Sequence, residues 1–294
     1  MVAKVIDGKL VAASIRQECR ERVDALKKKT GVTPGLAVIL VGNNPASAIY
    51  VANKVRACAE VGIQSLKKEL PADIDTDSLV AQIDALSRDP AIHGILVQLP
   101  LPPHIDMPRV LSSIAQEKDV DGFHLYNVGG LVAGNTVFPP CTPYGVVRML
   151  EFEKIPVEGR NVVVVGASNI VGKPMALMLM QREATVSICH AKTKDLAQYT
   201  ILADILVVAA GRPNLILPQM VKTGAVVIDV GINRLPNGKI AGDVDFEGVR
   251  QKASYITPVP GGVGPMTVTM LLVNTVTSAE RATGLSKTGI PEPA

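Results

Sequence analysis

Tyr50 and Lys54 are the first residues of this chain whose types and spacing suggest chemistry. They stand four positions apart in a segment with a helical pattern, so both side chains project from one face of one helix. A phenol beside an ammonium is useful in proton chemistry, because a desolvated lysine can exchange its proton near neutral pH. The same pair also fits an ordinary helix that carries a buried tyrosine and a lysine whose charged end reaches solvent.

Three further polar positions, in two segments, strengthen the case for catalysis. Residues Gly94–Leu99 read as a buried strand whose one polar side chain, Gln98, falls at the carboxyl end, where open α/β sheets bind ligands. A buried glutamine needs hydrogen-bond partners. Asp119 and Asp121 then stand in a predicted turn, although aspartate in a turn commonly bonds only its own backbone.

A glycine-rich loop follows much later in the chain. Residues Thr257–Thr267 contain three glycines among three prolines, which makes an adaptable backbone with rigid flanks. Such a loop can bring bare peptide groups close to a flat ligand. The alternative is a turn that connects two domains, but a connecting turn would hardly require so many glycines.

The run Val162–Val165 is typical of a strand buried on both faces of a parallel sheet. Gly166 lets the chain turn tightly beside a ligand, and Gly172 lets the following helix pack on the strand. The free N–H groups at the start of that helix would then face a pyrophosphate. A parallel sheet without a nucleotide can contain the same glycine turn, so this alternative stays open.

The end of the next strand indicates which nucleotide would bind. An NAD site usually has an acidic residue about 20 residues after the glycine turn, which holds the ribose 2′-hydroxyl. Residues Cys189–Lys194 contain no acid, and the first one is Asp195. Lys192 and Lys194 would instead neutralise a 2′-phosphate, so the sequence favours NADP. A solvated basic loop is the alternative for either lysine.

The elements that position these residues alternate between strands and helices, which predicts an α/β fold with a doubly wound parallel sheet in its second half. Strands are expected at residues 36–41, 64–70, 94–99, 162–165, 185–189, 205–209 and 225–230. Helices are expected at residues 10–28, from a Ser47 cap to 61, and at 77–87, 142–152 and 266–281. We expect two α/β domains, residues 1–140 and 141–267, with residues 268–294 returning to the first.

Length and composition exclude several classes of protein. A chain of 294 residues with 47% hydrophobic residues fits two globular domains. No apolar run reaches membrane-span length and the N-terminus has no signal-peptide pattern, so we expect a cytoplasmic protein with no membrane partner. The net charge of +3 and the absence of Trp argue against nucleic-acid binding. The four cysteines and four histidines show no ligand spacing, which predicts no disulfide and no metal site.

Together these motifs resemble the bifunctional methylenetetrahydrofolate dehydrogenase/cyclohydrolase family. The resemblance covers nearly the whole chain, and the motifs occur in the family's order. They are Y-V-A-N-K at 50–54, G-I-L-V-Q-L-P-L-P at 94–102, K-D-V-D-G-F-H at 118–124, P-C-T-P at 140–143, G-A-S-N-I-V-G-K-P at 166–174 and P-V-P-G-G-V-G-P-M-T at 258–267.

The resemblance implies an enzyme that transfers a hydride from 5,10-methylenetetrahydrofolate to NADP⁺ and then hydrolyses the methenyl product to 10-formyltetrahydrofolate. It implies a folate/catalytic N-terminal domain, a Rossmann-like nucleotide domain, an active-site cleft between them and a homodimer. The catalytic residues would be Lys54 for proton handling, Gln98 to tune and orient it, Tyr50 to position the folate and Asp121 to hold the pterin. The implied folate-binding residues are Tyr50, Lys54, Gln98, Leu99, Pro100, Asp121, Pro260, Gly261, Gly262 and Val263; those for the nucleotide are Gly166, Ala167, Ser168, Ile170, His190, Ala191, Lys192, Thr193 and Ile232.

The chain departs from the family pattern at three positions. Ala167 and Ala191 replace an arginine and a serine that many relatives use to contact the 2′-phosphate, so we expect Lys192, Thr193 and the nearby backbone to compensate. Leu125 replaces a common proline, with little expected effect.

Two other classes of protein remain as alternatives. A short-chain dehydrogenase also uses a Y-x-x-x-K pair, but that pair follows its nucleotide loop, whereas here it precedes the loop by more than 100 residues. A non-catalytic nucleotide-binding or regulatory protein would not require Lys54, Gln98 and Asp121 together.

Overall fold

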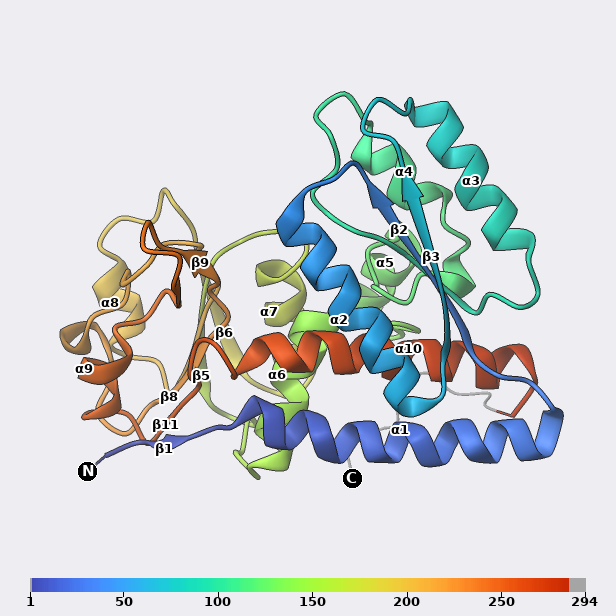
Figure 1. Ribbon diagram of the computed structural model, residues 1–294. Coiled ribbons are helices and arrows are strands. Elements are labelled where there is room, and N and C mark those ends of the chain that lie inside the picture. Colours follow the sequence, from blue (N-terminus) through green and yellow to red (C-terminus); the bar gives the residue numbers. More distant parts are fainter. Residues whose placement is uncertain (1, 286–294) are drawn as a thin grey trace. The chain divides into compact units, whose positions relative to one another are not determined.

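The computed structural model describes residues 2–285, which fold as two compact units (Figure 1). Unit 1 contains the chain up to Ala13 together with Thr142–Thr267, and unit 2 contains Ser14–Cys141 together with the chain from Val268 onward. Three helices contain the points at which the chain passes between units: α1 (Gly8–Thr30), α6 (Cys141–Phe152) and α10 (Val263–Ala282). No helix in the described part of the chain is long and apolar enough to span a membrane.

Unit 1 is built on a parallel sheet with the strand order β1-β11-β8-β7-β5-β6. Its strands are β1 (Lys4–Val5), β5 (Asn161–Val165), β6 (Thr185–Cys189), β7 (Ile205–Val208), β8 (Val226–Asp229) and β11 (Tyr255–Ile256). The central strands are buried along almost their whole length because helices cover both faces. In register, Val162 lies opposite Ile205 on β7, and Asn161 lies opposite Thr185 on β6.

Short helices and a hairpin complete unit 1. The remaining helices are α7 (Gly172–Met180), α8 (Leu196–Thr200), α9 (Phe246–Arg250) and the 3-10 turn η2 (Pro218–Met220). The antiparallel pair β9 (Asn233–Arg234) and β10 (Ile240–Ala241) follows β8. Buried side chains of β5, β7 and β8 form one core with residues of α9 and η2, and this core holds the carboxyl ends of the strands in fixed positions.

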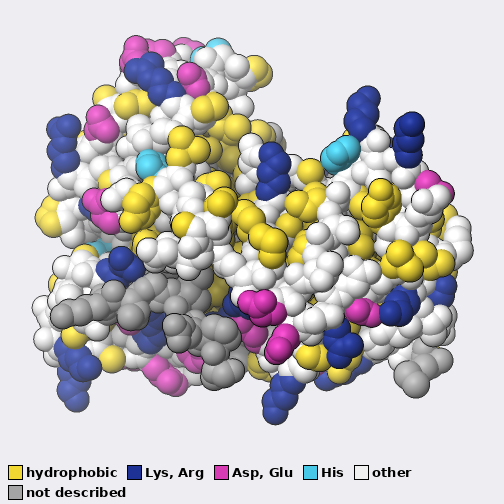
Figure 2. Space-filling view, turned by 180° about the vertical axis from the view of Figure 1, so that it is seen from behind, with side chains coloured by type: hydrophobic (Ala, Val, Ile, Leu, Met, Phe, Trp, Pro, Cys, Tyr) yellow, Lys and Arg dark blue, Asp and Glu magenta, His cyan; other side chains and the backbone are white. Residues whose placement is uncertain are grey.

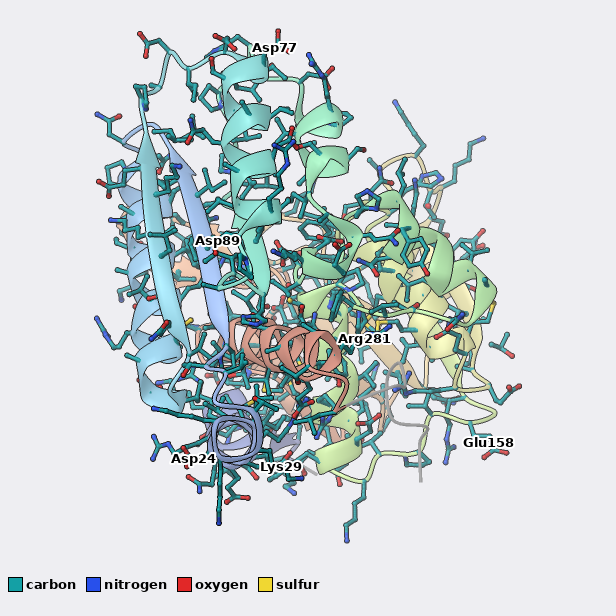
Figure 3. The ribbon with its side chains drawn as sticks, turned by 90° about the vertical axis from the view of Figure 1, so that its right-hand side faces the viewer. Asp24, Lys29, Asp77, Asp89, Glu158 and Arg281 are labelled. Atoms are coloured by element: carbon teal, nitrogen blue, oxygen red, sulfur yellow. The ribbon has the colours of Figure 1, made fainter. Side chains whose placement is uncertain are left out.

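Unit 2 contains the parallel sheet β3-β2-β4, formed by β2 (Gly35–Val41), β3 (Gln64–Leu70) and β4 (Gly94–Val97). Its helices are α2 (Pro45–Val61), α3 (Thr76–Arg88), α4 (Met107–Ser113), α5 (Leu125–Ala133) and the 3-10 turn η1 (Gln116–Lys118). Alternate side chains of β2 and β4 pack against α3 and α4, which lie on one side of the strands in Figure 3. Asp77 and Asp89, labelled there, mark the two ends of α3.

The predicted α/β class and two-domain organisation are confirmed. The predicted strands 64–70 and 185–189 have the observed bounds. The prediction of Ser47 as a helix cap is wrong: α2 begins at Pro45, Ser47 is buried, and its N–H donates to the Asn44 side chain (3.3 Å).

Two further differences concern the ends of elements and of the chain. Strand β4 ends at Val97, one residue before Gln98, because Pro100 and Pro102 lie in the following segment. The first residues lie in unit 1, because β1 pairs with β11 through Lys4 and Tyr255. Of the predicted C-terminal segment 268–294, residues 286–294 lie outside the described residues.

Candidate functional site

Lys54 and Gln98 meet at the carboxyl edge of the sheet of unit 2. The Lys54 ammonium donates a hydrogen bond to Gln98 Oε1 at 3.0 Å. Helix α2 begins just after β2, and the Gln98 backbone N–H bonds to Ile39 of β2 at 2.9 Å, so both residues are placed by the same strand. The Gln98 amide also donates to Leu99 O at 2.7 Å. That second bond fixes the amide so that its oxygen faces the lysine.

Asp121 is the carboxylate that interacts electrostatically with Lys54. Burial raises its pKa above the ordinary value, the Lys54 charge acts in the opposite direction, and the neighbouring Asp119 carboxylate raises it further. The thiol of Cys141 lies beside Asp121, and burial raises the pKa of that thiol well above its ordinary value. Asp121 therefore has an electrostatic partner in Lys54, in a setting where its proton is held more tightly than in water.

Asp119 has a different role, although it is only two residues away. Its side chain is 1% exposed and accepts hydrogen bonds from the Asn127 amide (2.8 Å) and from the His124 N–H (2.8 Å). Asn127 in turn accepts from the Phe138 N–H at 3.3 Å. Asp119 therefore stabilises the turn, which was the alternative interpretation of the two aspartates. Asp121 is then the aspartate that interacts electrostatically with Lys54.

Three supporting residues were not identified from the sequence. Lys118 donates to Asp89 O (2.8 Å) at the end of α3, and this bond anchors the segment that carries Asp121. The buried Asn274 of α10 donates to Val120 O (2.8 Å) and Pro139 O (3.1 Å). Ser278, one turn later, donates to Glu117 O at 2.8 Å. The spacing of Asn274 and Ser278 on an otherwise apolar helical face is a signal that could have revealed them.

The remaining candidates of unit 2 lie around the same edge. Tyr50 is one turn before Lys54 on α2 and is 43% exposed, so its ring is available to a ligand instead of being buried in the core. Leu99 and Pro100 follow Gln98 directly, and Pro100 is exposed. The structure therefore brings together the candidates from three separate motifs at one edge of one sheet.

The glycine-rich loop lies in unit 1, where its glycines have a packing role. A Cβ added to Gly262 would lie 2.5 Å from Pro258 O, and one added to Gly8 would lie 1.8 Å from Gly262 O. The start of α1 thus rests directly on the loop. Gly261 has a φ of 106°, a conformation that L-residues rarely adopt, and Pro260 is exposed.

The turn after β5 has the close packing that its glycines predict. A Cβ on Gly166, whose φ is 128°, would lie 2.2 Å from Ala209 O, and one on Gly172 would lie 2.0 Å from Gly166 O. The sequence predicted that the N–H groups at the start of α7 would face a pyrophosphate. In the structure, the Gly172 N–H instead donates to Ser168 Oγ (3.4 Å) and the Lys173 N–H donates to Ser168 O (3.0 Å). Ser168 therefore shapes the turn, and Ile170 stands 42% exposed on it.

The segment after β6 forms a compact, positively charged turn. The His190 N–H donates to Thr193 Oγ1 (2.9 Å), and the Lys192 N–H donates to His190 Nδ1 (3.1 Å). The side chains of Ala191, Lys192 and Lys194 are exposed. The nearest following acid, Asp195, accepts from the Gln198 amide (2.8 Å). The turn thus presents cations at the position where an NAD site presents an acid.

Ile232 completes the candidates of unit 1. It follows β8 and is 49% exposed. The candidates after β5, β6 and β8 accordingly share the carboxyl edge of one parallel sheet, which is the edge where such sheets bind ligands. Within the part of the chain that the structure describes, no group of His, Cys, Asp and Glu could hold a metal ion.

Comparison with known proteins gives a consistent result. The model of the tetrahydrofolate dehydrogenase/cyclohydrolase catalytic domain matches residues 6–121, and that of the NAD(P)-binding domain matches residues 140–283. The chain is 62% identical to a protein of Nitrosospira multiformis named Bifunctional protein FolD, over 96% of this chain and 98% of the relative.

Solved structures agree. The bifunctional methylenetetrahydrofolate dehydrogenase/cyclohydrolase of Campylobacter jejuni superposes with a TM-score of 0.93 at 56% identity, covering 95% of this chain and 99% of that one. The Trypanosoma brucei enzyme, solved with NADP cofactor and an inhibitor, gives 0.92 at 41% identity, covering 96% and 99%.

Proposed function

The chain belongs to the tetrahydrofolate dehydrogenase/cyclohydrolase family, and from this premise we propose which of its residues carry out the two reactions. The enzyme oxidises 5,10-methylenetetrahydrofolate to the methenyl compound with NADP⁺ as hydride acceptor, and hydrolyses that compound to 10-formyltetrahydrofolate. We assign the folate chemistry to unit 2 and nucleotide binding to unit 1. The separate matches to a catalytic and an NAD(P)-binding domain support this division.

Lys54 is the proposed proton-handling residue. The observation that carries this assignment is its 3.0 Å hydrogen bond to Gln98 Oε1, beside the Asp121 carboxyl. Hydrolysis of the methenyl carbon requires removal of a proton from the attacking water and delivery of one to the departing ring nitrogen. A lysine held by an acceptor, with a carboxyl nearby, can carry out both transfers.

Gln98 and Asp121 would also adapt the site to the charge of the substrate. Loss of hydride leaves a cationic methenyl compound, and the positive charge of Lys54 would oppose the charge that develops there. The Gln98 oxygen and the Asp121 carboxyl place negative potential beside Lys54, which offsets part of that opposition. We assign Asp121 to the amino and ring N–H donors of the pterin, since a carboxylate oxygen accepts from such donors.

The other folate contacts are assigned through the family resemblance. Tyr50 would place its exposed ring against the pterin, and Leu99 and Pro100 would form the adjoining wall. In unit 1 the assigned residues are Pro260, Gly261, Gly262 and Val263.

The residues after β5 and β6 fit NADP in shape and charge. Gly166 and Gly172 keep the turn after β5 tight, because a Cβ on either residue would collide with a backbone oxygen. Lys192 and Thr193 are the proposed substitutes for the 2′-phosphate contacts that Ala167 and Ala191 do not make. The nucleotide assignment also includes Ser168, Ile170, His190 and Ile232.

We also propose that the enzyme is a homodimer. Strand β6 is last in the sheet order of the described residues, and exposed apolar side chains surround it. These are Met180, Ile188, Tyr199, Ile201 and Leu202, between 43% and 61% exposed. Figure 2 shows hydrophobic side chains gathered on the visible face of unit 1, at the right of the view. A second copy would cover such an edge.

The homodimer and the cytoplasmic location can be tested directly. Ile188→Lys should convert a dimer to a monomer in analytical ultracentrifugation, and a wild-type monomer would refute the proposal. Fractionation of the source cells should recover the protein with cytoplasmic markers.

One assay tests the function as a whole. The purified protein is mixed with 5,10-methylenetetrahydrofolate and NADP⁺, and the absorbances of NADPH and of the methenyl compound are followed together. We expect NADPH to form and the methenyl signal to remain low, because hydrolysis follows. A preparation that forms NADPH but cannot hydrolyse added methenyltetrahydrofolate would refute the second activity.

A further inference from the structure

Asp243 is a fully buried carboxylate, with 0% exposure, that accepts hydrogen bonds from four donors. Its Oδ2 accepts from the backbone N–H groups of Ala210 (2.6 Å) and Gly211 (2.8 Å). Its Oδ1 accepts from the Arg212 N–H (2.8 Å) and the Asn233 side-chain amide (2.8 Å). Because the acceptor is charged, these bonds are stronger than ordinary amide bonds.

The donors belong to the segments that follow two neighbouring strands. Residues 210–212 come after β7, and Asn233 begins β9, directly after the short loop that follows β8, which pairs with β7 in the parallel sheet. Gly231 packs directly on the carboxylate, since a Cβ there would lie 2.3 Å from Asp243 Cγ. One side chain therefore fixes two loops at the edge of the sheet where open α/β folds bind ligands.

These loops touch the proposed nucleotide residues. Gly166 lies against Ala209, the residue before the first donor, at a separation that excludes a Cβ. Ile232 stands between Gly231 and Asn233 and is 49% exposed. The turns after β5, β7 and β8 therefore form a continuous series of contacts, with Asp243 buried beneath them.

We propose that Asp243 is a positioning residue for NADP⁺: it holds residues 210–212 and Ile232 in the conformation that binds the nucleotide. The inference rests on the nucleotide residues proposed above. Loops that are already ordered lose little conformational freedom when a ligand binds, whereas loops released from Asp243 would have to be ordered by the nucleotide itself.

A second buried acid, Asp229, has a separable role. Its Oδ1 accepts from the N–H groups of Gly231 (2.9 Å) and Asp243 (3.0 Å), and its Oδ2 accepts from the Val244 N–H (2.9 Å). Asp229 thus holds the backbone of Asp243, while the Asp243 side chain holds the loops. The proposal accordingly concerns the Asp243 carboxylate.

Asp243→Asn tests the inference while keeping the size of the side chain. Each carboxylate oxygen of Asp243 accepts from two N–H donors. In either orientation of the new amide, its NH₂ group replaces one of these oxygens, so two N–H donors lose their acceptor. We expect the KM for NADP⁺ to rise at least tenfold. Hydrolysis of methenyltetrahydrofolate, measured without nucleotide, should stay within twofold of wild type, which a general folding defect would not allow.

An exchange and a control sharpen the test. Combining Asp243→Asn with Asn233→Asp lets the new amide donate to a carboxylate at position 233 while its oxygen accepts from Ala210 and Gly211, so part of the NADP⁺ affinity should return. Asp245→Asn removes a nearby carboxylate that caps α9 by accepting from the Gly248 N–H (3.2 Å), and it should leave the KM for NADP⁺ unchanged.

Two results would overturn the proposal. One is an unchanged KM for NADP⁺ in Asp243→Asn, and the other is a parallel loss of both activities. A separate variant shows whether the nucleotide assignment itself has failed. Ile232→Asp changes a proposed nucleotide-binding residue directly, so an unchanged KM for NADP⁺ in that variant would refute the nucleotide assignment and not only the role of Asp243.

Discussion

Replacing Lys54 with Met should separate the two activities of the enzyme. The substitution keeps an unbranched stem on α2 and removes the amine that donates to Gln98 Oε1 at 3.0 Å. Hydrolysis depends on proton transfers for which we assign this amine, and general acid–base catalysis contributes about 10²–10⁴-fold to a rate. Hydride transfer depends mainly on holding two carbons in contact, which the remaining folate contacts can still do.

The structure sets the expected size of the effects. Methenyltetrahydrofolate hydrolysis should fall about 1,000-fold, equivalent to about 4 kcal/mol in the activation barrier. Folding should change by about 1 kcal/mol or less, because Gln98 is half-buried and water can replace the lost donor. The pKa of Asp121 should rise further once the Lys54 charge is gone, since that charge now holds it down.

The assay supplies methylenetetrahydrofolate and NADP⁺ and follows NADPH and the methenyl compound in the same cuvette. The methenyl compound should accumulate in Lys54→Met and remain low in wild type. Lys29→Met, at the exposed end of α1 (Figure 3), makes the same chemical change away from the site and should behave as wild type. Hydrolysis by Lys54→Met within about threefold of the wild-type rate would refute the assignment. Loss of both activities in a folded variant would refute the division between the two steps.

Three other predictions follow from the same geometry. Lys192→Asp should lower the ratio of kcat/KM for NADP⁺ over NAD⁺ at least tenfold; an unchanged ratio would make this lysine an ordinary surface charge. Asp121→Asn should weaken folate binding about tenfold or more in calorimetry, while NADP⁺ binding stays within twofold; equal losses would point to a folding role. Burial raises the pKa of Asp229 from 3.8 to about 6. Above about pH 6 the folded protein holds this carboxylate charged, which lowers the free energy of unfolding. That loss of stability is relieved as the pH falls from about 6 toward 3.8. The free energy of unfolding of wild type should therefore gain about 1 kcal/mol over that of Asp229→Asn between pH 7 and pH 5, and parallel pH profiles would contradict this.

Some features of the fold were predictable from local sequence because their causes are local. The valine run of β5 and its glycine turn favour a buried strand and a tight exit through local causes, and strands β3 and β6 have the predicted bounds. Strands β1 and β11 were not predicted. Each has two residues, too few for a pattern, and they exist because each finds a partner in the sheet of unit 1.

The site shows the same distinction between local and tertiary causes. The sequence alone determined the residue types and their order: a Tyr–Lys pair at helical spacing, a glutamine at the end of a buried strand, two aspartates in a turn and a glycine turn after a strand. The family resemblance pointed to Asp121, but residue type and spacing alone could not decide which aspartate interacts with Lys54, because both lie in one short motif. Tertiary structure decided this: Asn127 and His124 occupy Asp119, while the long-range packing of α2 against the sheet brings Lys54 to Asp121. The role of Asp243 was equally invisible, since its four donors are 10 to 33 residues away and meet it only when the strands align.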